Sequence, residues 1–180
     1  MPFKYYSVYD KDIDYKNGQS DENIAKMMLV PSHVRFIKSH IDAHLDEIDG
    51  KLKCLAFCVT VEHAMKMAEA FNALGIASDY VCAKTSVEDR ARLYSRLQDE
   101  NDDLKIIFSV NVMNEGVDLP RVNMSLFLRP TESSIVFIQQ LGPSLRKAPN
   151  KKKPVIIDFI GCKYARSTYI AWALGEFSNA

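Results

Sequence analysis

Apolar and polar residues follow two alternating patterns along the chain from residue 52 onward. Unbroken apolar runs alternate with stretches in which apolar side chains recur every three or four positions. The first pattern is typical of a strand covered on both faces, and the second is typical of an amphipathic helix. The runs predict strands at 54–59, 104–110, 122–128 and 154–160, with a shorter strand at 76–81. The spaced stretches predict helices at 61–74, 85–97 and 135–141.

The first 50 residues are less regular. Residues 3–9 alternate loosely and predict one strand. Apolar residues at helical spacing then run from Val34 to Ile48, with Pro31 before them and Gly50 after them. Proline and glycine in these places are typical of helix ends, so we expect one helix here.

Two helix starts carry capping signals. Thr85 and Glu88 match the T-x-x-E capping box, so we expect a helix to begin at Thr85, and either Thr131 or Ser133 is suited to cap the last helix. Strands that alternate with helices of this length predict βαβ units. The fold class is therefore α/β with a parallel central sheet.

Composition and charge exclude several classes of protein. The chain has 180 residues, 47% of them hydrophobic, which suits one globular domain. Lysine plus arginine and aspartate plus glutamate both number 23, so any nucleic-acid contact must come from a local patch. The N-terminus lacks an apolar signal sequence, and no apolar run approaches the ~20 residues of a membrane span. We expect a cytoplasmic protein without a membrane partner.

The metal-ligating residue types do not form a recognisable site. The four cysteines include no CxxC pair, so we expect buried free thiols. His40 and His44 have metal-compatible spacing, but no third ligand accompanies them, and we interpret them as surface histidines. The acidic stretch 46–49 spells D-E-x-D, yet it lies at the polar end of the expected helix and not after a buried strand. We therefore predict neither a metal site nor a catalytic role there.

Candidate chemistry lies where the strands end, because ligands of open α/β sheets bind beyond the carboxyl ends of the strands. Small, amide and charged residues follow three of the expected strands; they are Thr60, Glu62, His63, Asn111, Asn114, Glu115, Gly116, Asp118, Arg129 and Thr131. The forked guanidinium of Arg146 suits a phosphate. Asp118 is suited to accept a hydrogen bond from a ribose hydroxyl. We expect these two side chains to meet on one exposed rim.

Three segments resemble motifs of superfamily 2 helicases. FSVNVMNEGVDLPRVN resembles motif V, FIQQLGPSLRKA resembles motif VI, and CLAFCVTVEHAMKMAEAF is similar to motif IV and its following helix. The resemblance covers about residues 52–161 and is strongest to the branch of the type I restriction motor and the excision-repair helicases. It implies a three-layer RecA-like domain with a central parallel sheet flanked by helices, the C-terminal lobe of such an enzyme. It implies a core at 51–162, preceded by a strand and helix at 1–50 and followed by a terminal helix at 163–180.

The resemblance also implies roles for individual residues. Gly116 and Asp118 match the end of motif V, which faces the nucleotide ribose. Gln139 and Gly142 match the start of motif VI. Arg146 matches its second arginine, a finger that stabilises charge on the transferring phosphoryl group.

Three further residues are expected to contact nucleic acid. Ser109 matches a hydroxyl position of motif V, and Thr60 follows the motif IV strand. The helix expected at Thr85 would present its backbone N–H groups to a phosphate. The implied partners are nucleic acid, with double-stranded DNA preferred, and the N-terminal RecA-like lobe of the same protein.

One position departs from the family. Pro143 stands where motif VI has its first arginine, and proline supplies no donor. The sequence also contains no G-x-x-x-x-G-K-[ST] loop, so ATP and Mg²⁺ would be held mostly by the N-terminal lobe. We expect part of an ATP-dependent helicase or translocase that is inactive alone. The alternative is a degenerate RecA-like module that binds nucleic acid or protein without hydrolysing ATP.

Overall fold

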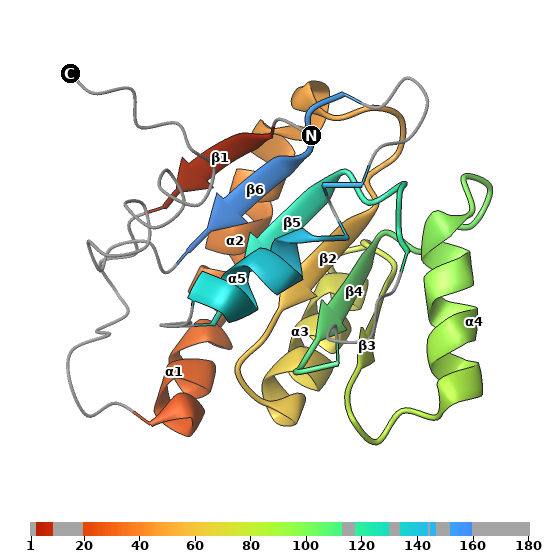
Figure 1. Cartoon of the computed structure of the whole chain (residues 1–180). Coiled ribbons are helices and arrows are strands. Elements are labelled where there is room, and N and C mark those ends of the chain that lie inside the picture. Colours follow the sequence, from red (N-terminus) through yellow and green to blue (C-terminus); the bar gives the residue numbers. More distant parts are fainter. Residues whose placement is uncertain are drawn as a thin grey trace.

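A six-stranded parallel sheet forms the centre of the protein (Figure 1). The computed structural model describes residues 3–8, 20–112, 118–129, 134–143, 145–146 and 152–159. The strand order is β1-β6-β5-β2-β4-β3, and every neighbouring pair is parallel. The strands are β1 (Lys4–Ser7), β2 (Cys54–Phe57), β3 (Ser78–Val81), β4 (Ile106–Ser109), β5 (Met124–Phe127) and β6 (Val155–Asp158).

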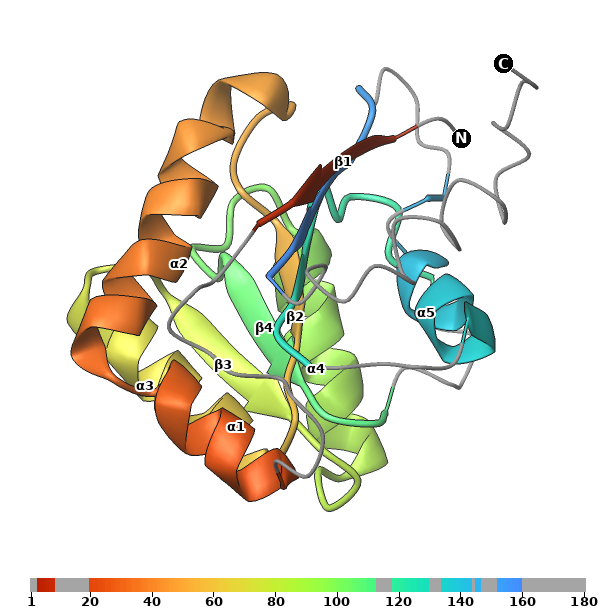
Figure 2. The ribbon, with the colours of Figure 1, turned by 90° about the vertical axis from the view of Figure 1, so that its left-hand side faces the viewer.

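Helices cover both faces of this sheet, which gives three layers (Figure 2). One face carries α1 (Asp21–Met28), α2 (Pro31–Ala43) and α3 (Val61–Ala73). The other face carries α4 (Val87–Gln98) and α5 (Ser134–Leu141). A short 3-10 helix, η1 (Leu45–Glu47), connects α2 towards β2. The predicted three-layer arrangement is confirmed.

Side chains of each strand alternate between the two layers. On β2, Cys54 and Ala56 pack with α1, α2 and α3, whereas Leu55 and Phe57 pack with α4 and α5. All four of these residues are buried, as are all residues of β4, β5 and β6. This two-sided burial explains why the four unbroken apolar runs correctly predicted four strands.

The N-terminal half differs from expectation in two places. Helix α1 was not predicted, although Ser20 caps it by accepting from the N–H of Asn23 and two acidic residues occupy its first turn. Its eight residues are too few to show a long apolar period. The helix that starts at Pro31 ends at Ala43 and not near Gly50, because η1 takes over the connection.

The cap of α4 also differs from the prediction. Ser86, and not Thr85, accepts a 3.0 Å hydrogen bond from the backbone N–H of Asp89. The Ser86 hydroxyl in turn donates to the Asp89 carboxylate at 2.9 Å. The cap is thus Ser86, one residue beyond the predicted Thr85, and its partner is Asp89 instead of Glu88.

Several expectations fall outside the described part of the chain. They are the caps Thr131 and Ser133, the fourth cysteine Cys162 and the terminal helix at 163–180. Cys54, Cys58 and Cys82 are buried free thiols, as predicted. Within the ranges that the structure describes, no helix has the length and apolar character needed to cross a membrane.

Candidate functional site

Asp118 and Arg146 form an ion pair, 28 positions apart in the sequence. Arg146 Nε lies 3.3 Å from Asp118 Oδ1, and the two side chains are 45% and 67% exposed. The prediction that they meet on an exposed surface is confirmed. Their chain neighbours Leu119 and Leu145 pack into the core cluster beneath α4 and α5. The pair is therefore anchored to the α4–α5 side of the sheet, where a bound molecule can reach both groups.

Two further predicted residues lie at the end of α5, shortly before Arg146 in the chain. Gln139 and Gly142 are both exposed. The N–H of Gly142 donates to the carbonyls of Ile138 and Gln139 at 3.1 and 3.2 Å. A Cβ on Gly142 would lie 3.1 Å from the Gln139 carbonyl oxygen, so a side chain there would crowd the turn. Gly116, the remaining nucleotide candidate, lies outside the described residues.

Pro143 follows this turn and is buried. The N–H of Leu145 donates back to the carbonyls of Leu141 and Gly142 at 3.1 and 3.2 Å, which ties Leu145 to the end of α5. Proline has no N–H to donate and no charged group. Of the two positions at which an arginine is expected from the sequence, 143 and 146, this chain therefore presents one guanidinium, that of Arg146.

The predicted nucleic-acid contacts Thr60 and Thr85 lie at the ends of β2 and β3. Thr60 Oγ1 accepts from the N–H of His63 at 3.1 Å and caps α3. Thr85 Oγ1 accepts from the N–H of Cys82 at 3.0 Å. Each hydroxyl therefore already has a structural partner, and both residues are half-buried.

The third predicted contact, Ser109, is placed differently. It ends β4, is 1% exposed, and its hydroxyl has no hydrogen-bond partner among the described residues. A buried hydroxyl without a partner is unusual in folded proteins. Ser109 thus lies beneath the surface of the strand ends, two residues before the chain turns at Asn111.

A hydrogen bond that sequence reasoning did not foresee joins Asn111 and Arg129. Arg129 Nη1 donates to Asn111 Oδ1. Both residues were noted as following strands, but their pairing depends on the strand order, which the sequence pattern does not reveal. Asn111 is also the one non-glycine residue with positive φ, +55°, in the described part of the chain.

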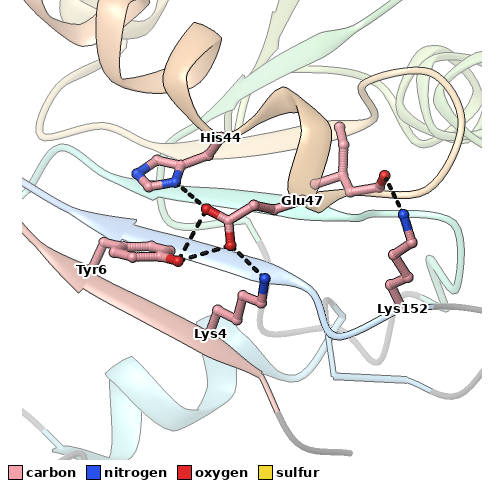
Figure 3. A network of polar contacts seen from close by, with 6 residues as sticks. Lys4, Tyr6, His44, Glu47 and Lys152 are labelled. Atoms are coloured by element: carbon pink, nitrogen blue, oxygen red, sulfur yellow. Dashed lines mark hydrogen bonds and ion pairs between the residues drawn. The ribbon is translucent and has the colours of Figure 1, made fainter.

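A cluster of polar side chains surrounds Glu47 and includes Lys4, the first residue of β1 (Figure 3). Glu47 of η1 accepts from Lys4 Nζ at 2.5 Å and from the Tyr6 hydroxyl at 2.8 Å, and contacts His44 Nδ1 at 2.6 Å. The rings of Tyr6 and His44 stack with centroids 4.0 Å apart. These partners, Lys4 above all, lower the pKa of Glu47 to about 2. The cluster fixes edge strand β1 to the end of α2, which is a structural role.

A second polar group is buried near the carboxyl end of β2. His63, in the first turn of α3, is 0% exposed, and its Nδ1 accepts from the N–H of Val59 at 3.3 Å. Burial, with a smaller contribution from His33, lowers the pKa of His63 to about 4. His63 is therefore neutral near pH 7 and supports the turn that carries Thr60.

Comparison with known proteins gives one family and several relatives. The family described as "Helicase conserved C-terminal domain" matches residues 34–148, well over half of the 180-residue chain. A putative helicase of Sulfolobus islandicus filamentous virus is 33% identical over 151 residues, 82% of this chain and 26% of that protein. The UvrABC system protein B of Chlamydia trachomatis is 29% identical over 155 residues, 79% of this chain and 23% of that protein.

A solved structure extends the comparison to the fold. A fragment of a putative HsdR subunit of a type I restriction enzyme from Vibrio vulnificus superposes with a TM-score of 0.71 at 21% identity. The superposition covers 93% of this chain and 33% of that chain. The chain spans about a third or less of the curated relatives that it matches, 34% of a Lactococcus phage protein and 26% of the viral helicase.

Proposed function

Because the chain belongs to the family of helicase conserved C-terminal domains, we propose that it acts as the second RecA-like lobe of an ATP-dependent superfamily 2 helicase or translocase. The observation that carries this proposal is the exposed Asp118–Arg146 pair. It joins the segments that resemble motifs V and VI, and it leaves one arginine on the surface next to a carboxylate. An ATP molecule held by an N-terminal lobe would meet this surface when the two lobes close.

Arg146 is suited to act as the finger residue. An exposed ion pair contributes only about 0–1 kcal/mol, so Arg146 can exchange Asp118 for a phosphate at little cost. Its guanidinium then makes paired hydrogen bonds to phosphate oxygens and stabilises the charge that develops during transfer. The exchange releases Asp118, which can accept a hydrogen bond from a ribose hydroxyl.

The remaining predicted residues complete the two surfaces. Gln139, Gly142 and Gly116 would flank the nucleotide. Thr60 and Thr85 would contact the phosphates of a nucleic-acid strand at the carboxyl ends of β2 and β3. Closure on ATP and release after hydrolysis would shift these contacts relative to those of the N-terminal lobe, which moves the protein along the strand.

The N-terminal lobe would supply the parts that this chain lacks. Phosphate binding in such enzymes needs a glycine-rich loop with a lysine, and Mg²⁺ needs acidic ligands after a buried strand. No such loop occurs in this sequence. We therefore expect the 180-residue chain alone to hydrolyse no ATP, and we expect the full-length protein to bind ATP with Mg²⁺ between the lobes.

The test is ATP hydrolysis by the full-length protein, measured with and without a single-stranded DNA, double-stranded DNA or RNA oligonucleotide. We expect DNA-stimulated hydrolysis by the full-length protein and none by the 180-residue chain. Hydrolysis stimulated only by RNA would correct the proposed substrate. Absence of any ATP binding or hydrolysis would remove the proposal.

A second candidate function rests on Pro143. With one motif VI arginine replaced by a buried residue that cannot donate, the lobe could bind nucleic acid without fuelling movement. In that case the full-length protein would bind DNA equally well with and without ATP. Its ATP turnover would be no higher than that of a variant whose glycine-rich phosphate-binding loop in the N-terminal lobe has lost its lysine.

A further inference from the structure

Asn111 and Arg129 follow two strands that are not neighbours in the sheet. Asn111 follows β4 and Arg129 follows β5, and β2 runs between these two strands. Adjacent strands lie about 4.8 Å apart, so the two strand ends are separated by about 10 Å. The Arg129 side chain must therefore cross the carboxyl end of β2 to donate to Asn111.

Two observations agree with this placement of the guanidinium. Cys58 directly follows β2, and its buried thiol is close enough to Arg129 that the positive charge opposes the rise in pKa caused by burial. Arg129 is half-buried and not extended into solvent. The bridge thus lies over β2, whose next residues lead to Thr60.

Asn111 is held in an unusual backbone conformation at the same place. Its φ of +55° lies in the left-handed region, which asparagine tolerates better than other residues with a side chain. The side chain that permits this turn is also the acceptor for Arg129. One residue therefore sets the direction in which the chain leaves β4 and ties that turn to the end of β5.

We propose that Arg129 is a positioning residue for the nucleic-acid contacts, and that its bridge to Asn111 fixes the ends of β4, β2 and β5 as one unit. This inference rests on the proposed function. In the strand order, Thr60 follows the strand that lies between the two ends of the bridge. Backbone hydrogen bonds from Cys58 to Ser109 and from Leu128 to Phe57 already join the strand ends, so losing the bridge removes the side-chain tie between the residues beyond them. Nucleic-acid binding would then weaken while the core of the sheet stays intact.

Two variants separate the loss of the Asn111–Arg129 hydrogen bond from any change in the left-handed backbone at Asn111. Asn111→Gly removes the amide acceptor but keeps the left-handed conformation, since glycine adopts it freely. Arg129→Gln removes the charged donor. Arg121→Gln is the matched control, because Arg121 also pairs across elements, with Glu100, on an exposed surface away from the strand ends.

The measurement is DNA-stimulated ATP hydrolysis by the full-length protein as a function of single-stranded oligonucleotide concentration, with the thermal midpoint of each variant. We expect Asn111→Gly and Arg129→Gln each to raise the half-saturating DNA concentration about three- to tenfold, the effect of one hydrogen bond. The double variant should match Arg129→Gln alone, because that variant already removes the bridge and the loss of the Asn111 acceptor then adds nothing. The thermal midpoints and the Arg121→Gln control should stay near wild type.

Four results would overturn the inference while the proposed function stands. Three of them are wild-type DNA affinity in both single variants, a loss in the double variant larger than that of Arg129→Gln alone, and a large fall in thermal midpoint that accounts for the loss. A salt dependence reduced by Arg129→Gln alone would also overturn it, because that result indicates a direct phosphate contact. A wild-type protein that neither binds DNA nor hydrolyses ATP would instead remove the proposed function, and this inference with it.

Discussion

Replacing Glu47 by glutamine tests how strongly edge strand β1 depends on its polar anchor. Hydrogen bonds from Lys4, His44 and Tyr6, in that order of effect, lower the pKa of Glu47 from 4.5 to about 2. At about 1.4 kcal/mol per pKa unit, a fall of that size corresponds to at most ~3.5 kcal/mol. The Glu47 and Lys4 side chains are 19% and 42% exposed, so solvent screening reduces the contribution to about 1–2 kcal/mol.

The sign of the pH dependence follows from the direction of the shift. The folded pKa lies below the unfolded value of 4.5, so the stabilisation is complete above pH 4.5 and is lost as the pH falls towards 2. Glu47→Gln should lower the free energy of unfolding by about 1–2 kcal/mol at pH 7, and by less than half of that amount at about pH 3.

Urea unfolding of the 180-residue chain, followed by far-UV circular dichroism at both pH values, measures this difference. Glu62→Gln is the matched control, because Glu62 pairs with Lys66 on an exposed turn of α3 and its side chain is 64% exposed. We expect the control to leave the midpoint nearly unchanged. An equal loss at both pH values, or a loss no larger than that of the control, would refute the reasoning.

Three further changes have definite expected outcomes. Ser86→Ala removes the cap of α4 and should cost about 1 kcal/mol in thermal or urea unfolding; no loss would show that the α4 cap contributes nothing. Burial lowers the pKa of His63 from 6.5 to about 4, so the chain should lose stability as the pH falls through that window. His63→Gln should flatten the curve of urea midpoint against pH there, and an unchanged slope would speak against this assignment. Pro143→Arg in the full-length protein should raise the ATP turnover about tenfold or more, and unchanged turnover would count against a missing finger residue.

The central sheet could be predicted from the sequence because its strands are buried on both faces. An unbroken apolar run such as residues 54–59 indicates this burial from the sequence alone, whichever strands lie on either side of it. The edge strand β1 shows the limit of this reasoning. It pairs with β6, Lys4 opposite Val155, and neither its half-exposed residues nor the long sequence separation reveals that partner.

The part of the candidate site that could be predicted is the part that follows from the order and spacing of the motif-like segments. Asp118 and Arg146 were expected to meet, and they do. The apolar run 104–110 predicted a strand buried on both faces, and the burial of Ser109 agrees with it, but a contact from its hydroxyl to nucleic acid would need exposed surface that Ser109 lacks. The Asn111–Arg129 bridge depends on β2 inserting between β4 and β5, which is a property of the strand order alone. The predicted start of a helix can also be wrong by one residue, since the cap of α4 is Ser86 and not Thr85.

The claim that this lobe supplies the finger arginine is tested most directly by steady-state ATP hydrolysis of the full-length protein with Arg146→Ala. The control is Arg92→Ala, which removes an exposed arginine paired with Asp89 on α4. We predict that Arg146→Ala lowers kcat on the order of 10³-fold, with the KM for ATP changed much less, because the interaction forms mainly in the transition state. A kcat equal to that of wild type and of Arg92→Ala would contradict the account.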